Sequence, residues 1–108
     1  MTDLGLSDEV VDQLRFVLKN FSQVEEVVLY GSRAKGTQRA GSDIDLTLIG
    51  PDLTLEIRNE IGRQLDDLSL PYNMIDLSIC EHIQNPALLE HIGRVGISLY
   101  KKDMRSNG

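Results

Sequence analysis

A glycine-rich basic loop followed by a pair of aspartates constrains this chain more than any other feature. The loop reads Gly31-Ser32-Arg33-Ala34-Lys35-Gly36, and it directly follows a run rich in β-branched residues. A glycine at the end of a strand lets the backbone turn sharply and approach a ligand closely. If Ser32 begins a short helix, free N–H groups and the positive end of the helix dipole there can bind phosphate. The loop therefore predicts a phosphate-binding turn at Gly31 and Ser32, with positive charge from Arg33 and Lys35.

The aspartate pair follows the loop in a segment with strand periodicity. Asp43, Asp45 and Thr47 alternate with Ile44, Leu46 and Leu48, which indicates a strand with one apolar face. The two carboxylates would lie on one strand face, about 7 Å apart along the backbone. Like charges that converge to about 4 Å repel by roughly 4 kcal/mol at an effective dielectric constant near 20. A bound cation would remove this repulsion, and Mg²⁺ is expected because it prefers hard oxygen ligands shared with substrate phosphates.

A third aspartate, Asp76, stands between Ile75 and Leu77 in a mainly apolar run. If its strand neighbours the strand of Asp45, Asp76 falls on the same face and completes a cluster of three carboxylates. Two would hold metal, and the third would help bind a second metal or accept the proton of an attacking hydroxyl.

Each of these features has a simpler interpretation when it is taken alone. A Gly-Ser pair is most often a turn, and an Asp-x-Asp segment is most often a solvated strand face. Their spacing, together with Asp76 downstream, favours a functional site. His82 and His91 have no metal-binding partner at helical or loop spacing, so we interpret them as surface or boundary residues.

The periodicity of apolar residues predicts a two-layer arrangement. Helices are expected at residues 7–21, 54–68 and 86–95, with a short helix at 32–35. Strands are expected at residues 24–30, 43–48 and 72–80, with a short edge strand at 97–100. The chain of 108 residues is predicted to be one domain over 1–108, with a frayed tail from about 101 to 108. This order indicates an α/β (α+β) fold, a small mixed sheet with helices packed mainly on one face.

The composition excludes several classes of protein. No apolar run is long enough to cross a membrane, and the acidic N-terminus does not resemble a signal peptide. The net charge of −6 argues against direct binding of nucleic acid, which depends on Lys and Arg to neutralise phosphates. The one cysteine, Cys80, cannot form an internal disulfide, so we interpret it as a buried strand residue. A cytoplasmic protein is therefore expected.

Gly31-Ser32, ten further residues and then Asp43-Ile44-Asp45 resemble the signature of the polymerase-beta-like nucleotidyltransferase superfamily. The chain length and the loop sequence are similar to those of the minimal nucleotidyltransferases, the MNT antitoxin family. The resemblance implies the polymerase-beta-like nucleotidyltransferase fold, ATP as the nucleotide and Mg²⁺ as the metal. It also implies that Gly31 and Ser32 bind the triphosphate, and that three aspartates ligate metal and serve catalysis: Asp43, Asp45 and Asp76. Family members of this size are typically paired with a helical HEPN toxin, and some transfer AMP to a tyrosine on it.

The sequence thus favours an enzyme that moves AMP from Mg-ATP to a protein hydroxyl, with a tyrosine of a cognate HEPN toxin as the expected acceptor. Such a reaction depends mostly on positioning and on electrostatic stabilisation of the phosphoryl oxygens. Two alternatives stay open: a non-catalytic antitoxin that masks its toxin by binding, and a transferase that acts on a small-molecule hydroxyl. Assembly into a homo-oligomer also stays open.

Overall fold

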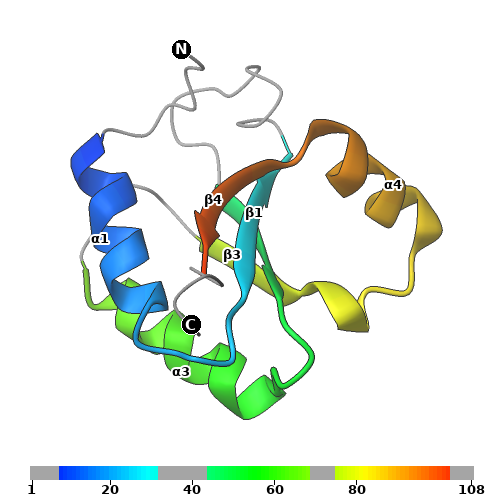
Figure 1. The fold of residues 1–108 in the computed structure, drawn as a ribbon. Coiled ribbons are helices and arrows are strands. Elements are labelled where there is room, and N and C mark those ends of the chain that lie inside the picture. Colours follow the sequence, from blue (N-terminus) through cyan, green and yellow to red (C-terminus); the bar gives the residue numbers. More distant parts are fainter. Residues whose placement is uncertain (1–7, 32–43, 69–74, 103–108) are drawn as a thin grey trace, which may run out of the picture.

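A four-stranded mixed sheet lies at the centre of the structure, a computed structural model that describes residues 8–31, 44–68 and 75–102 (Figure 1). Its strands are β1 (Glu26–Tyr30), β2 (Ile44–Ile49), β3 (Ile75–Ile79) and β4 (Ile97–Lys101). They are arranged in the order β3-β2-β1-β4. Strand β1 is antiparallel to both β2 and β4, whereas β2 and β3 are parallel. The predicted mixed sheet is confirmed, and the short strand near the C-terminus is one of its edges.

The helices divide unequally between the two faces of the sheet. Helices α1 (Asp8–Leu18) and α3 (Leu55–Asp66) pack on one face, and α4 (Pro86–Val95) lies against the other (Figure 1). The alternation along β1 reflects this division, because Val27 and Leu29 join the core with α1 and α3 while Val28 and Tyr30 face α4. The expectation of helices mainly on one face is therefore confirmed.

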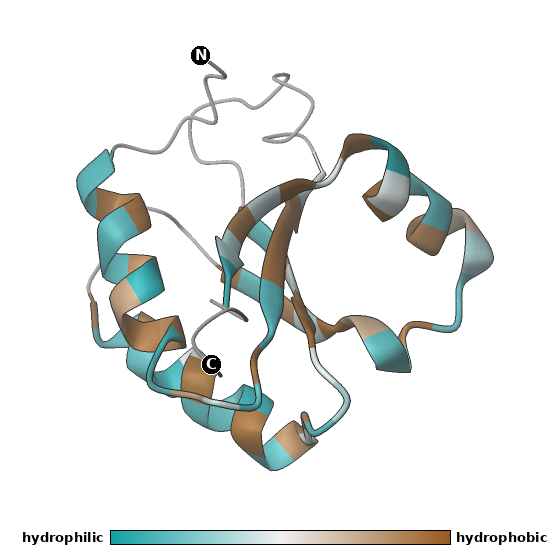
Figure 2. Cartoon of the chain, in the orientation of Figure 1, coloured by the Kyte–Doolittle hydropathy of each residue, from teal (hydrophilic) through white to brown (hydrophobic). Residues whose placement is uncertain are grey.

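The apolar core fills the space between the sheet and helices α1 and α3. Both helices are amphipathic: apolar residues recur along them at helical spacing, with polar residues between (Figure 2). The fully buried side chains of the two helices include Leu14, Leu18 and Ile61, and those of β2 include Leu46 and Leu48. This packing fixes β2, so the residues that alternate with its leucines must face α4.

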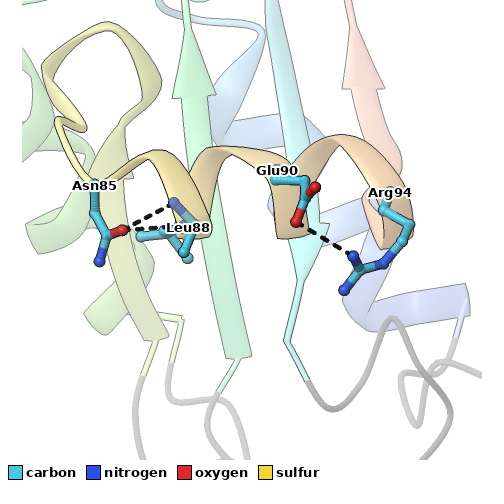
Figure 3. Close-up of polar contacts among 5 residues, drawn as sticks. Asn85, Leu88, Glu90 and Arg94 are labelled. Atoms are coloured by element: carbon cyan, nitrogen blue, oxygen red, sulfur yellow. Dashed lines mark hydrogen bonds and ion pairs between the residues drawn. The ribbon is translucent and has the colours of Figure 1, made fainter.

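Local signals define the ends of α4. The side chain of Asn85 accepts hydrogen bonds from the backbone N–H groups of Ala87 and Leu88 (Figure 3). Pro86 occupies the first turn. Glu90 and Arg94 form an ion pair at 3.5 Å, and both side chains are exposed. The helix has the predicted bounds, 86–95.

Three other predicted boundaries differ from the structure by one to three residues. Helix α1 ends at Leu18 instead of residue 21, because Asn20 and Phe21 form hydrogen bonds to the carbonyls three residues earlier. Strand β1 begins at residue 26 instead of 24. Strand β3 ends at Ile79, where a single 3₁₀ turn, η1 (Cys80–His82), begins.

The interpretation of Cys80 as a buried strand residue is corrected by this turn. Cys80 is partly exposed, and its carbonyl accepts a hydrogen bond from the N–H of Ile83. Burial of its thiol and the nearby charge of Glu81 raise the pKa of Cys80. The predicted helix at 32–35 and the tail beyond residue 102 lie outside the described residues.

Arginines from the core-side helices cover both edges of the sheet. Arg15 of α1 donates from Nε to the carbonyl of Leu99 on β4 at 2.8 Å. Arg58 of α3 donates from Nε to the carbonyl of Leu77 on β3, also at 2.8 Å. Each bond satisfies a carbonyl that an edge strand would otherwise present to another chain. Among the described helices, none is both long enough and apolar enough to span a membrane.

Candidate functional site

Asp45 and Asp76 occupy paired positions on the parallel strands β2 and β3. Asp45 is also paired with Tyr30 of β1, so these three residues form a row across three strands on the face toward α4. Neighbouring strands are about 4.8 Å apart, and paired residues of a parallel sheet point to the same side. Asp45 is partly buried and Asp76 is exposed. The condition for Asp76 to share a face with Asp45 is therefore met, while Asp43 lies outside the described residues.

Gly31 carries the chain out of β1 immediately beside Asp45. Its φ of +80° lies in the left-handed region, which glycine adopts without strain. A Cβ at this position would collide with Oδ2 of Asp45. Both the backbone conformation and the available space thus require glycine here. Ser32, Arg33 and Lys35, the other residues predicted to bind the nucleotide, lie outside the described residues.

His91 of α4 contacts the same turn through its imidazole. The backbone N–H of Gly31 donates a hydrogen bond to Nε2 of His91 at 3.2 Å. The imidazole ring also meets the ring of Tyr30 edge-on, with centroids 6.3 Å apart and an interplanar angle of 81°. His91 is partly buried and His82 is exposed, as expected for boundary and surface residues. Sequence reasoning nevertheless missed the contact that His91 makes.

One signal in the sequence could have identified His91. Leu88, Ile92 and Val95 recur at the spacing of the inner face of a helix, and His91 falls on the same stripe. A polar residue on an apolar stripe requires a hydrogen-bonding partner. The sequence offers no means of identifying that partner, because Gly31 lies 60 residues earlier in the chain.

The pKa of Tyr30 is affected by the negative charges at this site. Its side chain is only 8% exposed, and burial is the main cause that raises its pKa above the ordinary value of 10.0. A hydrogen bond with Ser78 acts in the opposite direction and lowers the pKa, while the charges of Asp76 and Asp45 raise it further. The two carboxylates therefore act on the same phenol from neighbouring strands.

The hydroxyl groups of Thr47 and Ser78 lie on the same face of the sheet, two residues further along β2 and β3 than the aspartates. Ser78 donates from Oγ to Oγ1 of Thr47 at 3.0 Å, and these residues form the next pair along β2 and β3. Thr47 is completely buried. This hydrogen bond joins the two strands that carry Asp45 and Asp76, and it helps to fix their register.

The donor set fits a hard divalent cation. Asp45 and Asp76 supply carboxylate oxygens, which suit Mg²⁺ better than a thiophilic metal. Nε2 of His91 already accepts the hydrogen bond from Gly31. Within residues 8–31, 44–68 and 75–102, no three His, Cys, Asp or Glu side chains form a metal-binding group. The predicted cluster of three carboxylates depends on Asp43, so it stays a prediction.

The sequence matches the family model described as Polymerase beta, Nucleotidyltransferase over residues 12–105. The chain belongs to this nucleotidyltransferase family. The matched range includes Gly31, Ser32 and all three aspartates. None of the curated proteins matches the chain.

Solved structures of toxin–antitoxin complexes have the same fold as this nucleotidyltransferase. A chain of the MntA-HepT complex is 18% identical with a TM-score of 0.65, over 94% of this chain and 78% of that one. A chain of a toxin–antitoxin complex with AMP-PNP is 22% identical with a TM-score of 0.61, over 94% and 79%. A chain of a Shewanella oneidensis complex, which contains a tri-AMPylated HEPN toxin and an MNT antitoxin, is 16% identical with a TM-score of 0.59, over 94% of this chain and 78% of that one. The resemblance to the MNT family is thus confirmed at the level of the fold.

Proposed function

We propose that this nucleotidyltransferase transfers AMP from Mg-ATP to a protein hydroxyl and acts as the antitoxin of a HEPN toxin. The observation that carries the proposal is the arrangement of Asp45, Asp76 and Gly31. Asp45 and Asp76 are paired on neighbouring strands, and Asp45 lies against Gly31, which directly precedes the basic segment in the sequence. A turn that binds phosphates next to a pair of metal-binding carboxylates is what a nucleotidyl transfer requires.

The choice of nucleotide and partner has support from the similar structures. One of them contains AMP-PNP, an analogue of ATP. Another contains a HEPN toxin that carries three AMP groups in complex with an MNT antitoxin. Both concern proteins that are less than 25% identical to this chain, so they support its activity and partner only as a proposal. The expected acceptor is a tyrosine of the toxin.

In the proposed reaction, the acceptor oxygen forms a bond to the α-phosphorus of ATP. The bond from that phosphorus to the oxygen that bridges to the β-phosphate breaks, and pyrophosphate leaves. Gly31 and Ser32 would hold the triphosphate, while Arg33 and Lys35 would offset its negative charge. These residues contribute mainly by positioning the triphosphate for in-line attack.

The aspartates have two roles in this scheme. Asp43, Asp45 and Asp76 would hold Mg²⁺, which neutralises charge on the phosphoryl oxygens when it is bound. The proton of the acceptor hydroxyl would pass to a carboxylate. Asp76 is favoured for this step because it is exposed, whereas Asp45 is partly buried against Gly31.

The direct test is transfer of radioactive AMP from α-³²P-labelled ATP to a HEPN toxin, to be sought in the adjacent reading frame of the genome. Wild-type protein should label the toxin, and Asp45→Asn combined with Asp76→Asn should not. Asp52→Asn is the matched control, because Asp52 is an exposed aspartate in the turn that follows β2. If the toxin is neutralised without becoming labelled, masking by binding is the mechanism instead. Labelling of small-molecule alcohols with no labelling of the toxin would favour the other alternative.

A further inference from the structure

His91 and Asp45 both contact the turn at Gly31. The N–H of Gly31 donates to Nε2 of His91 at 3.2 Å. The Cα of Gly31 also lies so close to the carboxylate of Asp45 that no Cβ fits between them. Gly31 is thus held by a side chain of α4 and a side chain of β2, directly after the last residue of β1.

The helix that carries His91 is itself firmly placed on the sheet. Asn85 caps its N-terminus, and Ile92, the residue next to His91, is only 7% exposed. At its C-terminal end, a Cβ on Gly96 would lie 2.6 Å from Cγ1 of Val28, so the chain passes close to β1 there. The imidazole also packs edge-on against Tyr30. His91 therefore has a defined position relative to β1, and it can fix the position of a backbone group.

The hydrogen bond also defines which atoms of the imidazole are used. A backbone N–H can only donate, so Nε2 must act as the acceptor, and the neutral ring carries its proton on Nδ1. The hydrogen bond therefore requires an acceptor atom at the position of Nε2, and it does not require an aromatic ring. A side chain of similar length with an acceptor at its end can replace it, whereas an aromatic ring without one cannot.

We propose that His91 is a positioning residue of the nucleotide site. By accepting the hydrogen bond from the amide of Gly31, it fixes Gly31 against the carboxylate of Asp45 at the end of β1. The inference rests on the proposed function, in which Gly31 binds the triphosphate. His91 itself does not need to touch the nucleotide.

Two substitutions separate the acceptor atom from the ring. His91→Phe keeps an aromatic ring against Tyr30 but removes the acceptor, and His91→Gln removes the ring but keeps an acceptor oxygen at a similar reach. His82→Phe is the matched control, because His82 is the other histidine of the chain and is exposed in η1. All variants are compared with the wild type well below their melting temperatures, so that each is folded.

Two measurements are made on each protein: the hydrogen exchange rate of the Gly31 amide by NMR, and the Kd for Mg-ATP by calorimetry. Loss of one hydrogen bond of ordinary strength corresponds to about a fivefold change in an equilibrium constant. We therefore expect His91→Phe to speed exchange at Gly31 and to raise the Kd about fivefold or more. His91→Gln should stay within about twofold of the wild type in both measurements, and His82→Phe should match the wild type.

The outcomes distinguish this inference from the proposed function. If His91→Phe speeds exchange at Gly31 but binds Mg-ATP as tightly as the wild type, His91 supports the backbone only, and the inference is wrong. If His91→Gln and His91→Phe lose the same affinity, the packing of the ring is what matters, and the acceptor role is again wrong. If the wild type itself does not bind Mg-ATP, the proposed function fails first, and the positioning role fails with it.

Discussion

The carboxylate of Asp45 lies against Gly31 where any other residue at position 31 would place its Cβ. A residue at the end of β1 and a residue near the start of β2 are thereby tied together sterically. The positive φ of Gly31 adds a second constraint at the same position. Substitution of Gly31 should therefore affect both the stability of the fold and the position of a proposed metal ligand.

We predict that Gly31→Ala lowers the free energy of unfolding by about 1–2 kcal/mol, because alanine is strained at this φ. The new Cβ would also displace the carboxylate of Asp45, so AMP transfer should fall by far more than the loss of folded protein explains. Gly62→Ala is the control, since a Cβ at Gly62 in α3 would meet nothing within 4 Å. That variant should gain about 0.5–1 kcal/mol from helix propensity with unchanged transfer. Urea unfolding and the labelling assay measure the two effects.

The metal-binding argument predicts that Mg-ATP stabilises the protein and that ATP with a chelator does so far less. A ligand present at 100 times its Kd adds about 2.7 kcal/mol to the free energy of unfolding. Without the cation, Asp45 and Asp76 repel the triphosphate, because all of these groups are negative. Thermal melts with ATP, with and without Mg²⁺, measure the difference. Equal shifts under both conditions would show that the carboxylates do not act through a metal.

The hydrogen bond from Arg58 to the carbonyl of Leu77 predicts a different kind of effect, on the edge of the sheet. Arg58→Met keeps an unbranched side chain on α3 but removes the donor, so we expect a loss of about 1 kcal/mol. Arg63→Met is the control, because Arg63 is exposed and its partner is Glu60 on the same helix, a pair worth less than about 0.5 kcal/mol. Urea unfolding measures the free energy of unfolding of both variants. Similar losses would mean that the bond from Arg58 to Leu77 contributes no more to stability than the exposed pair of Arg63 and Glu60.

Tyr30 provides a pH-dependent test of the charges at the site. Asp76→Asn removes one of the negative charges that raise the pKa of Tyr30, so this pKa should fall toward its ordinary value while burial keeps it above that value. A titration of the ring carbon resonances of labelled tyrosine by NMR measures the change. Asp52→Asn, which removes a charge elsewhere, should leave the pKa of Tyr30 as it is in the wild type. A fall of the same size in both variants would mean that only the overall charge matters.

The same shift has a consequence for stability. The pKa of Tyr30 is raised in the folded state, so its contribution to stability is fully present below pH 10, near the pKa of an unfolded tyrosine. The contribution is lost as the pH rises from there through the pKa of the folded state. Stability above pH 10 should therefore decline less steeply in Asp76→Asn than in the wild type.

The parts of the fold that the sequence predicts well are those with local causes. Asn85-Pro86 and Gly96 mark the ends of α4, and the structure has the helix between them. The end of β3 was missed because Cys80 is as compatible with a strand as with the turn that it enters. The 3₁₀ turn depends on the path of the chain toward α4, which periodicity does not encode.

The site could be predicted only in part, for a related reason. The positions of Asp45 and Asp76 on one face follow from strand periodicity once β2 and β3 are neighbours. The contact of His91 with Gly31 depends on how α4 docks across 60 residues of chain, and no local pattern specifies it. Ser32, Arg33, Lys35 and Asp43 lie outside the described residues, so their roles stay predictions.

The last prediction separates an enzymatic antitoxin from one that only masks its toxin. Asp76 is exposed on β3, so Asp76→Asn should fold normally and still bind the toxin. If Asp76 binds metal or accepts the proton, its substitution should lower the transfer rate by several orders of magnitude, because these effects act mainly in the transition state. Masking requires one antitoxin for each toxin, whereas an enzyme turns over.

The measurement is a titration of the activity of the toxin with this protein in the presence of Mg-ATP. Wild-type protein at a small fraction of the toxin concentration should silence all of the toxin, given time for turnover. Asp76→Asn should silence little of it even at equal concentration, although the variant should still co-purify with the toxin. Wild type without Mg-ATP serves as the matched control, because it has every contact of the complex but no AMP to transfer. Equal protection by the variant and the wild type at every ratio would establish masking as the mechanism, because a residue needed only for transfer has no effect on a complex that acts by occupancy alone.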